Sequence, residues 1–272
     1  PRGQDFAEGE VVLSAGTLLD AAHVTVAAAM NHPGICVYRR PRIALIATGD
    51  ELVAPGGMPR PDQIIASNTF GVAALIEAAG GEVLDLGIVG DDRNLIEAAI
   101  SRAVEAQVDV LVTLGGASVG DHDLVQASLK AKGMELDFWR IAMRPGKPLM
   151  VGSLGAMQVL GLPGNPVASL VCGLLFLEPL VATLARRPLH DRSGSAVAAT
   201  TLSANDQRQD YLRARLSRDN QGRLVAEAFG KQDSSMMKIF AQSDALIVRP
   251  PHAPELPAGS PCPMILLRTK SG

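Results

Sequence analysis

The chain has 272 residues and a formal net charge of −3; 47% of its residues are hydrophobic and only 3% are aromatic. This length allows one large α/β domain or a medium domain with a smaller companion, and the apolar content indicates a substantial core rather than disorder. The slightly acidic balance argues against a dominant nucleic-acid-binding surface. The three cysteines are far apart and odd in number, so we expect reduced thiols in a cytoplasmic protein.

Two further observations bear on location and completeness. The longest apolar run, residues 167–177, ends at Glu178-Pro179 and is too short to span a bilayer, so no membrane association is expected. No secretory signal is recognisable. Because the chain begins at Pro1 rather than at Met, we expect it to be a fragment of a longer protein.

Residues 1–40 are expected to be the remnant of an N-terminal domain that leads into a linker. Residues 11–13 and 35–39 are patterned as short strands, and Asp20 is placed to cap a helix that runs to Met30. We interpret the arginines of Arg39-Arg40-Pro41-Arg42 as a solvated junction.

From residue 43 onward, apolar strands alternate with helices. Strands are predicted over residues 43–47, 82–86 and 108–114, separated by helices over residues 69–79 and up to residue 105, with Asp91 or Asp92 as the cap of the second. This order predicts a three-layer α/β/α domain with a mostly parallel sheet over residues 41–187. Its remaining predicted elements are a helix over 124–132, strands over 138–143, 149–152 and 158–162, and a long apolar helix over 167–185.

The composition changes around residues 186–195. Short β-patterned runs follow, and Pro, Gly and Asp-Asn separate them. This spacing predicts a small all-β barrel or sandwich over residues 193–272, and we take the barrel as the expected form. The runs cover residues 197–202, 211–216, 224–228, 245–248 and 264–267.

Four polar loops are expected at one edge of the parallel sheet, because ligands of such sheets bind beyond the carboxyl ends of the strands. Their sequences are TGDE, GGASVGDHD, RPGKP and LPGNP. Glycines at a strand-to-helix junction let backbone N–H groups approach an anion closely. Asp50 and Asp123 suit a Mg²⁺ ion, whereas Arg144 and Lys147 suit a phosphorylated ligand.

Any one of these loops alone is better explained as a turn or a helix cap, and only their joint occurrence indicates a site. His122 is interpreted as a surface-loop histidine, and Ser118 has no adjacent base that would make it a nucleophile. The five histidines show no zinc-ligand spacing. GxGxxG, GxxxxGK[ST] and GxSxG are absent, which counts against the corresponding nucleotide-binding and hydrolase sites.

The combination of these polar loops and their neighbouring motifs resembles the molybdopterin molybdotransferase family. These are the MoeA-type enzymes, to which the C-terminal region of gephyrin is similar. The motifs that carry the resemblance are TGDEL, Ser67-Asn68, LGGASVGDHD, MRPGKP and GLPGNPVAS, with PRGQDFAEGEVVLSAGTLL upstream and YLRAR and QDSSMM downstream. We expect this chain to lack the family's usual N-terminal portion, which contributes to the family's dimer. Many relatives also carry Lys where this chain has Arg144, which exchanges a point charge for a planar fork.

The resemblance implies a transferase of molybdenum cofactor biosynthesis that inserts molybdate into adenylylated molybdopterin and releases AMP, assisted by Mg²⁺. It implies catalytic roles for Asp123, Asp50 and Lys147, with Asp50 and Asp123 as the Mg²⁺ ligands. The substrate-binding residues that it implies are Thr48, Gly49, Glu51, Ser67, Asn68, Gly115, Gly116, Ser118, Gly120, Arg144, Pro145, Gly146, Pro163, Gly164, Asn165 and Pro166.

A homodimer is implied as well, with molybdopterin adenylyltransferase and apo-molybdoenzymes as partners. Without the N-terminal portion, we expect the chain to bind its ligand but to be weak or inactive as an insertase. Two alternatives stay open. One is a non-catalytic pterin-binding or scaffold module like the anchoring part of gephyrin. The other is a nucleotide pyrophosphatase of the competence-damage type, which would resemble residues 43–185 but lack the β domain.

Overall fold

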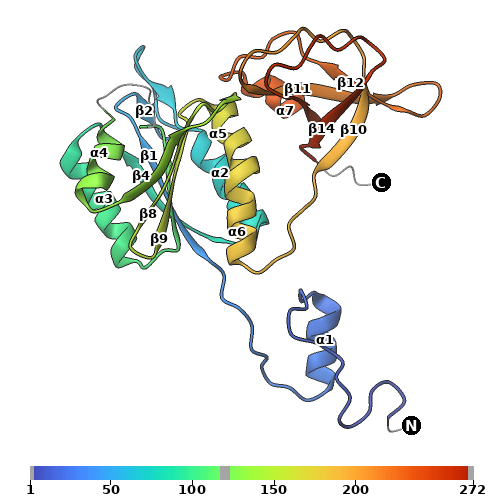
Figure 1. Ribbon diagram of the computed structural model, residues 1–272. Coiled ribbons are helices and arrows are strands. Elements are labelled where there is room, and N and C mark those ends of the chain that lie inside the picture. The colour runs from blue at the N-terminus through green and yellow to red at the C-terminus, as the bar shows by residue number, and fades with distance from the viewer. Residues whose placement is uncertain (1–2, 117–122, 269–272) are drawn as a thin grey trace.

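A computed structural model of the chain describes residues 3–116 and 123–268. It contains an α/β domain, a β-barrel and an extended N-terminal segment (Figure 1). The barrel and the small β2–β3 arm stand at the same end of the α/β domain, and the N-terminal segment leaves from the opposite end.

The α/β domain is built on one six-stranded sheet in the order β4-β1-β5-β9-β8-β6. The first four strands in this order are parallel, and β8 and β6 continue antiparallel. Every residue of β5 is buried, as expected for an apolar strand that is covered on both faces. The bounds are β1 (Arg42–Thr48), β4 (Glu82–Val89), β5 (Val110–Leu114), β6 (Glu135–Arg140), β8 (Pro148–Leu154) and β9 (Met157–Leu162).

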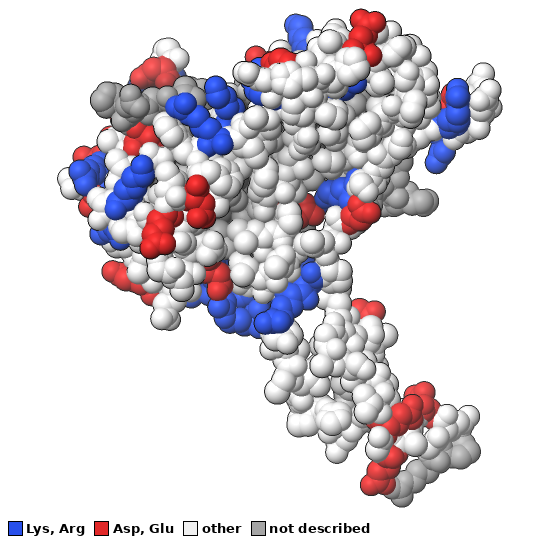
Figure 2. Space-filling view, in the orientation of Figure 1, with Lys and Arg blue, Asp and Glu red and all other residues white. Residues whose placement is uncertain are grey.

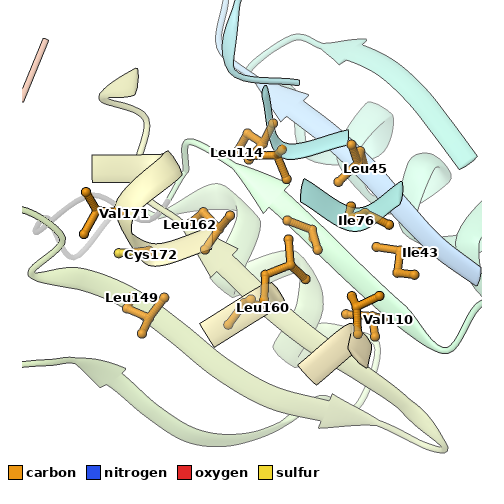
Figure 3. Close-up of a cluster of buried hydrophobic side chains, with 14 of the residues drawn as sticks. Ile43, Leu45, Ile76, Val110, Leu114, Leu149, Leu160, Leu162, Val171 and Cys172 are labelled. Atoms are coloured by element: carbon orange, nitrogen blue, oxygen red, sulfur yellow. The ribbon is translucent and has the colours of Figure 1, made fainter. Parts of the chain in front are cut away.

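Helices cover both faces of this sheet, so the predicted three-layer arrangement is confirmed. On one face, α2 (Asn68–Ala78), α5 (Pro166–Cys172), the π-helical turn Gly173–Leu177 and α6 (Glu178–Leu184) close one core. Figure 3 shows residues of this core, among them Val110 of β5, Leu160 of β9, Ile76 of α2 and Val171 of α5. On the other face, α3 (Arg93–Glu105), capped by Asp92, and α4 (Leu124–Ala131) close a second core.

The long apolar helix predicted over residues 167–185 forms over residues 166–184. Among the described residues, it is the helix whose length and hydropathy would allow it to cross a membrane. However, 56% of its most apolar window is buried inside the protein, where Val167, Val171 and Leu177 belong to the first core. It is therefore a core helix of the α/β domain. Pro166 occupies its first turn, where a missing N–H costs nothing.

Five strands form the C-terminal barrel in the order β12-β10-β14-β13-β11, and pairing of β12 with β11 closes it. The predicted barrel is thus confirmed. Its core contains small residues such as Ala214, Ala226 and Ala245. The bounds are β10 (Ser193–Ala198), β11 (Gln209–Arg218), β12 (Leu224–Ala228), β13 (Ala245–Arg249) and β14 (Pro261–Leu266), with the unpredicted helix α7 (Met237–Gln242) before β13.

The N-terminal segment corrects part of the expected pattern. Helix α1 (Ala21–Ala29) forms with Asp20 as its cap, but residues 11–13 and 35–39 form no strand, because no described strand pairs with them. Arg39 is also more than a solvated junction: its guanidinium donates two hydrogen bonds to Asp109, at 2.6 and 2.7 Å. Figure 2 shows acidic side chains gathered on this segment.

Candidate functional site

A cleft of about 840 Å³ opens at the carboxyl ends of β1, β5 and β9, where the sequence predicted a ligand site. The β2 (Leu52–Val53) and β3 (Ile64–Ile65) arm forms a further wall. Twelve predicted site residues line this cleft: Thr48, Gly49, Glu51, Ser67, Asn68, Gly115, Gly116, Asp123, Pro163, Gly164, Asn165 and Pro166.

The other predicted residues take different positions. Asp50 is exposed and does not line the cleft; its Oδ1 accepts a hydrogen bond from the backbone N–H of Asp91, 3.0 Å away. Lys147 is exposed beside Pro148, which does line the cleft. Arg144, Pro145 and Gly146 lie outside the lining, and Ser118, Gly120 and His122 lie outside the described residues.

Gly115 and Gly116 form a cradle on the cleft floor directly above Thr48. Both adopt positive φ, +91° and +65°. A Cβ on Gly115 would stand 2.8 Å from the carbonyl oxygen of Thr48, and one on Gly116 would stand 2.2 Å from Val125 Cγ2. Glycine is therefore the residue that fits both positions, because any side chain would clash with Thr48 or Val125.

The hydroxyl of Thr48 lies buried beside this cradle. The residue is 5% exposed, and its Oγ1 has no hydrogen-bond partner within the described part of the chain. A Cβ at Gly116 would lie 3.1 Å from this Oγ1. Buried hydroxyls are nearly always paired, so the Thr48 hydroxyl is a polar group beside the glycines that the described residues leave unsatisfied.

Three carboxylates, those of Glu51, Asp91 and Asp123, line the cleft near the cradle. Asp123 also caps α4, because its Oδ1 accepts a hydrogen bond from the N–H of Gln126 at 3.0 Å. Glu51 folds back over Gly49, where a Cβ would stand 2.3 Å from Glu51 Oε2. Asp91 was predicted only as a helix cap, although its place just after the end of β4 is the same strand-end signal that singled out the other loops.

The described residues contain no group of three or more His, Cys, Asp or Glu that could hold a metal ion alone. Mg²⁺, however, is usually held by one or two carboxylates together with substrate phosphates and water. The acidic wall beside the glycine cradle fits that mode of binding. It does not fit a cage made only of protein ligands.

The barrel also reaches the cleft through Ser234 and Ser235. The Nδ2 of Asn165 donates to Ser234 Oγ at 2.9 Å, and the N–H of Val167 donates to the carbonyl oxygen of Ser234 at 3.0 Å. Ser235 itself lines the cleft. We did not predict this residue as part of the site, because its contribution depends on how the two domains pack.

In sequence and in structure, the chain is similar to known proteins of molybdopterin metabolism. Residues 44–183 match the family model described as a probable molybdopterin binding domain, and residues 195–267 match the MoeA C-terminal region (domain IV). The chain is 35% identical over 251 residues to a molybdopterin molybdenumtransferase of Haemophilus influenzae, covering 90% of this chain and 61% of that protein. A protein of the same name from Bacillus subtilis is 31% identical over 271 residues, covering 99% and 63%.

Among solved structures, the molybdopterin biosynthesis moeA protein of Pyrococcus horikoshii superposes with a TM-score of 0.81 at 27% identity. The match covers 97% of this chain and 64% of that one. The chain therefore spans 61–64% of the length of these three proteins.

Proposed function

The chain belongs to the MoeA-type family of molybdopterin-binding proteins, as its motifs predicted, and from this premise we propose that it is a molybdopterin molybdotransferase of molybdenum cofactor biosynthesis. It takes adenylylated molybdopterin and molybdate as substrates and releases AMP. The observation that carries the proposal is the cleft that Gly115, Gly116 and three carboxylates line, next to a Thr48 hydroxyl that has no partner among the described residues. The barrel after residue 193 supports it over a pyrophosphatase that lacks this domain.

Within this cleft, the glycine backbone and Thr48 hold the phosphates of the substrate, and Lys147 supplies a positive charge at the edge. Ser67, Asn68 and the LPGNP loop, residues 162–166, hold the remainder of the ligand. Asp123 accepts the proton of a water molecule that attacks the phosphoanhydride, so that the P–O bond breaks and AMP leaves. The two thiol groups of the dithiolene then bond to molybdenum, and their two protons leave with one oxygen atom of molybdate as water.

Asp123 would hold Mg²⁺ in the cleft, and Asp50 would support it through its hydrogen bond to the backbone of Asp91. When bound, the ion neutralises the negative charge that builds up on the phosphoanhydride oxygens. Glu51 and Asp91 are further ligand candidates, because their carboxylates line the same wall.

We further propose that the protein is a cytoplasmic homodimer. Val24 (54% exposed), Val37 (67%) and Tyr38 (64%) of the N-terminal segment support a second copy as partner, because isolated segments rarely leave so many large apolar side chains in water. Molybdopterin adenylyltransferase would supply the substrate and apo-molybdoenzymes would receive the product.

The decisive experiment combines the protein with adenylylated molybdopterin, molybdate and Mg²⁺, and measures both AMP release and reconstitution of an apo-molybdoenzyme. We expect tighter binding of the adenylylated pterin than of molybdopterin, and AMP release that depends on Mg²⁺ and is weaker in this chain than in a version extended at its N-terminus. Binding without AMP release in this chain and in a version extended at its N-terminus would instead identify a non-catalytic pterin-binding module. Absence of binding to either pterin would overturn the proposal.

A further inference from the structure

The loop that carries Lys147 contacts the barrel as well as the α/β domain. Strand β7 (Met143–Arg144) pairs in parallel with the start of β11, where Met143 lies opposite Gln209 and Arg144 opposite Asp210. The N–H of Gln209 donates to the carbonyl oxygen of Ala142 at 2.9 Å. The orientation of this loop therefore depends on contacts between the two domains.

A bidentate ion pair reinforces this attachment. The Nε of Arg144 donates to Asp210 Oδ1 at 2.8 Å, and its Nη2 donates to Asp210 Oδ2. The Asp210 side chain is only 6% exposed. The remaining Nη1 of Arg144 reaches Asp206 at 3.5 Å. The paired carboxylate also raises the pKa of the Arg144 guanidinium.

The rest of the loop packs without spare room. Gly146 has a φ of +113°, and a Cβ there would stand 2.5 Å from the Sγ of Cys172 in α5. The N–H of Ile141 donates to the carbonyl oxygen of Lys147 at 3.1 Å and closes the loop on itself. The backbone around Lys147 is thus fixed on one side by α5 and on the other by the Arg144–Asp210 pair.

These contacts argue against Arg144 as a group that binds a substrate anion. Its fork is already used by a nearly buried carboxylate, and removing one partner from such a pair leaves an uncompensated buried charge. We infer that Asp210 is a positioning residue: it holds Arg144, and with it residues 143–148, so that Lys147 stands at the edge of the cleft. The task of Lys147 rests on the proposed function, whereas the clamp itself does not.

The two roles of Arg144 predict opposite effects of Asp210→Asn. If Arg144 binds the substrate anion, Asp210→Asn frees its guanidinium and tightens binding. If Asp210 acts through the loop, Asp210→Asn weakens binding of adenylylated molybdopterin about tenfold, which corresponds to the loss of one charge-assisted hydrogen bond. Restoring the carboxylate with Asp210→Glu should recover part of the affinity.

The test measures two quantities on the full chain: amide hydrogen exchange of Ile141 and Gln209, which needs no ligand, and the affinity for adenylylated molybdopterin. We expect Asp210→Asn to raise both exchange rates about tenfold, because the clamp no longer resists local opening. The double variant Arg144→Gln/Asp210→Asn, which leaves no buried charge, should bind no more weakly than either single variant. Asp219→Asn, which removes an ion pair at the far end of β11, is the matched control.

The outcomes separate the clamp from the proposed function. Unchanged exchange rates in both the Asp210→Asn and the double variant would overturn the clamp, whatever the ligand data show. Faster exchange with unchanged or tighter binding would overturn the positioning role. If the unaltered protein binds no pterin, the proposed function fails, and the exchange rates alone then decide whether the clamp exists.

Discussion

The Nδ2 atom of Asn68 donates a hydrogen bond to the carbonyl oxygen of Gly164, 2.7 Å away and 96 residues further along the chain. This bond ties the start of α2 to the LPGNP loop across the cleft. Asn68→Ala should lower the free energy of unfolding by about 1 kcal/mol or less, as expected for one exposed hydrogen bond, but should weaken pterin binding more strongly, because the two walls separate. Chemical denaturation and titration with adenylylated molybdopterin measure the two effects. Asn94→Ala, on the exposed start of α3, should change neither, and equal affinities for both variants would contradict this role of Asn68.

The glycine cradle makes a prediction that separates strain from ligand binding. Gly115 and Gly133 have almost the same φ, +91° and +94°, but a Cβ at Gly133 would meet nothing within 4 Å. Gly133→Ala should lose about 1–2 kcal/mol of stability from the left-handed backbone, and Gly115→Ala should lose more, because its Cβ would also stand 2.8 Å from the carbonyl oxygen of Thr48. Only Gly115→Ala should also abolish binding of adenylylated molybdopterin, because its methyl group presses on Thr48. If Gly133→Ala weakens binding as much, the cradle does not hold the ligand.

How much the sequence predicts depends on whether a signal is local. Asp20 before α1 and the apolar run of β5 are local signals, and both predictions are confirmed. Residues 35–39 have a β pattern but no partner strand, which only the tertiary structure decides.

The same distinction between local signals and tertiary packing explains which residues of the candidate site could be predicted. Gly115 and Gly116 follow β5 directly, and Asp123 ends the loop that they begin, so the strand-end rule found them. The ion pair of Arg144 with a residue 66 positions away and the approach of Ser235 to the cleft depend on how the barrel packs against the α/β domain. Sequence spacing contains no information about that packing.

Asp123 has a capping role and a proposed catalytic role, and Asn can replace it in the first but not in the second. Since Asn and Asp are equally good helix caps, Asp123→Asn should keep the free energy of unfolding within about 0.5 kcal/mol. AMP release should fall at least about a hundredfold, as expected for the loss of a general base. Asp92→Asn is the control. The Oδ1 atom of Asp92 caps α3 by accepting hydrogen bonds from the N–H groups of Asn94 and Leu95, and this variant should leave AMP release unchanged. Normal turnover by Asp123→Asn would remove Asp123 from the mechanism.

The contact between Arg39 and Asp109 predicts how stability depends on pH. The two hydrogen bonds from Arg39 hold the pKa of Asp109 below its ordinary value near 3.8. A carboxyl group whose pKa is lowered by folding stabilises the folded state above the unfolded pKa, and this contribution is lost as the pH falls through the folded pKa. The urea midpoint should therefore fall more steeply below pH 4 in the unaltered protein than in Asp109→Asn. Asp62→Asn, in the exposed pair with Arg60, should follow the unaltered curve. Parallel curves for the unaltered protein and Asp109→Asn would show that this contact contributes nothing.

The three cysteines should differ sharply in reactivity. Cys36 is exposed, whereas Cys172 and Cys262 are buried, and burial raises the pKa of Cys172 to about 12. Because the thiolate is the reactive form, a thiol reagent at pH 8 should modify one cysteine rapidly in the folded protein and all three after denaturation. Cys36→Ser should remove the fast phase, while Cys172→Ser should not. Because Cys172 packs against Gly146, rapid modification of Cys172 would mean that the loop carrying Lys147 opens readily, and the rigid placement of that lysine would be wrong.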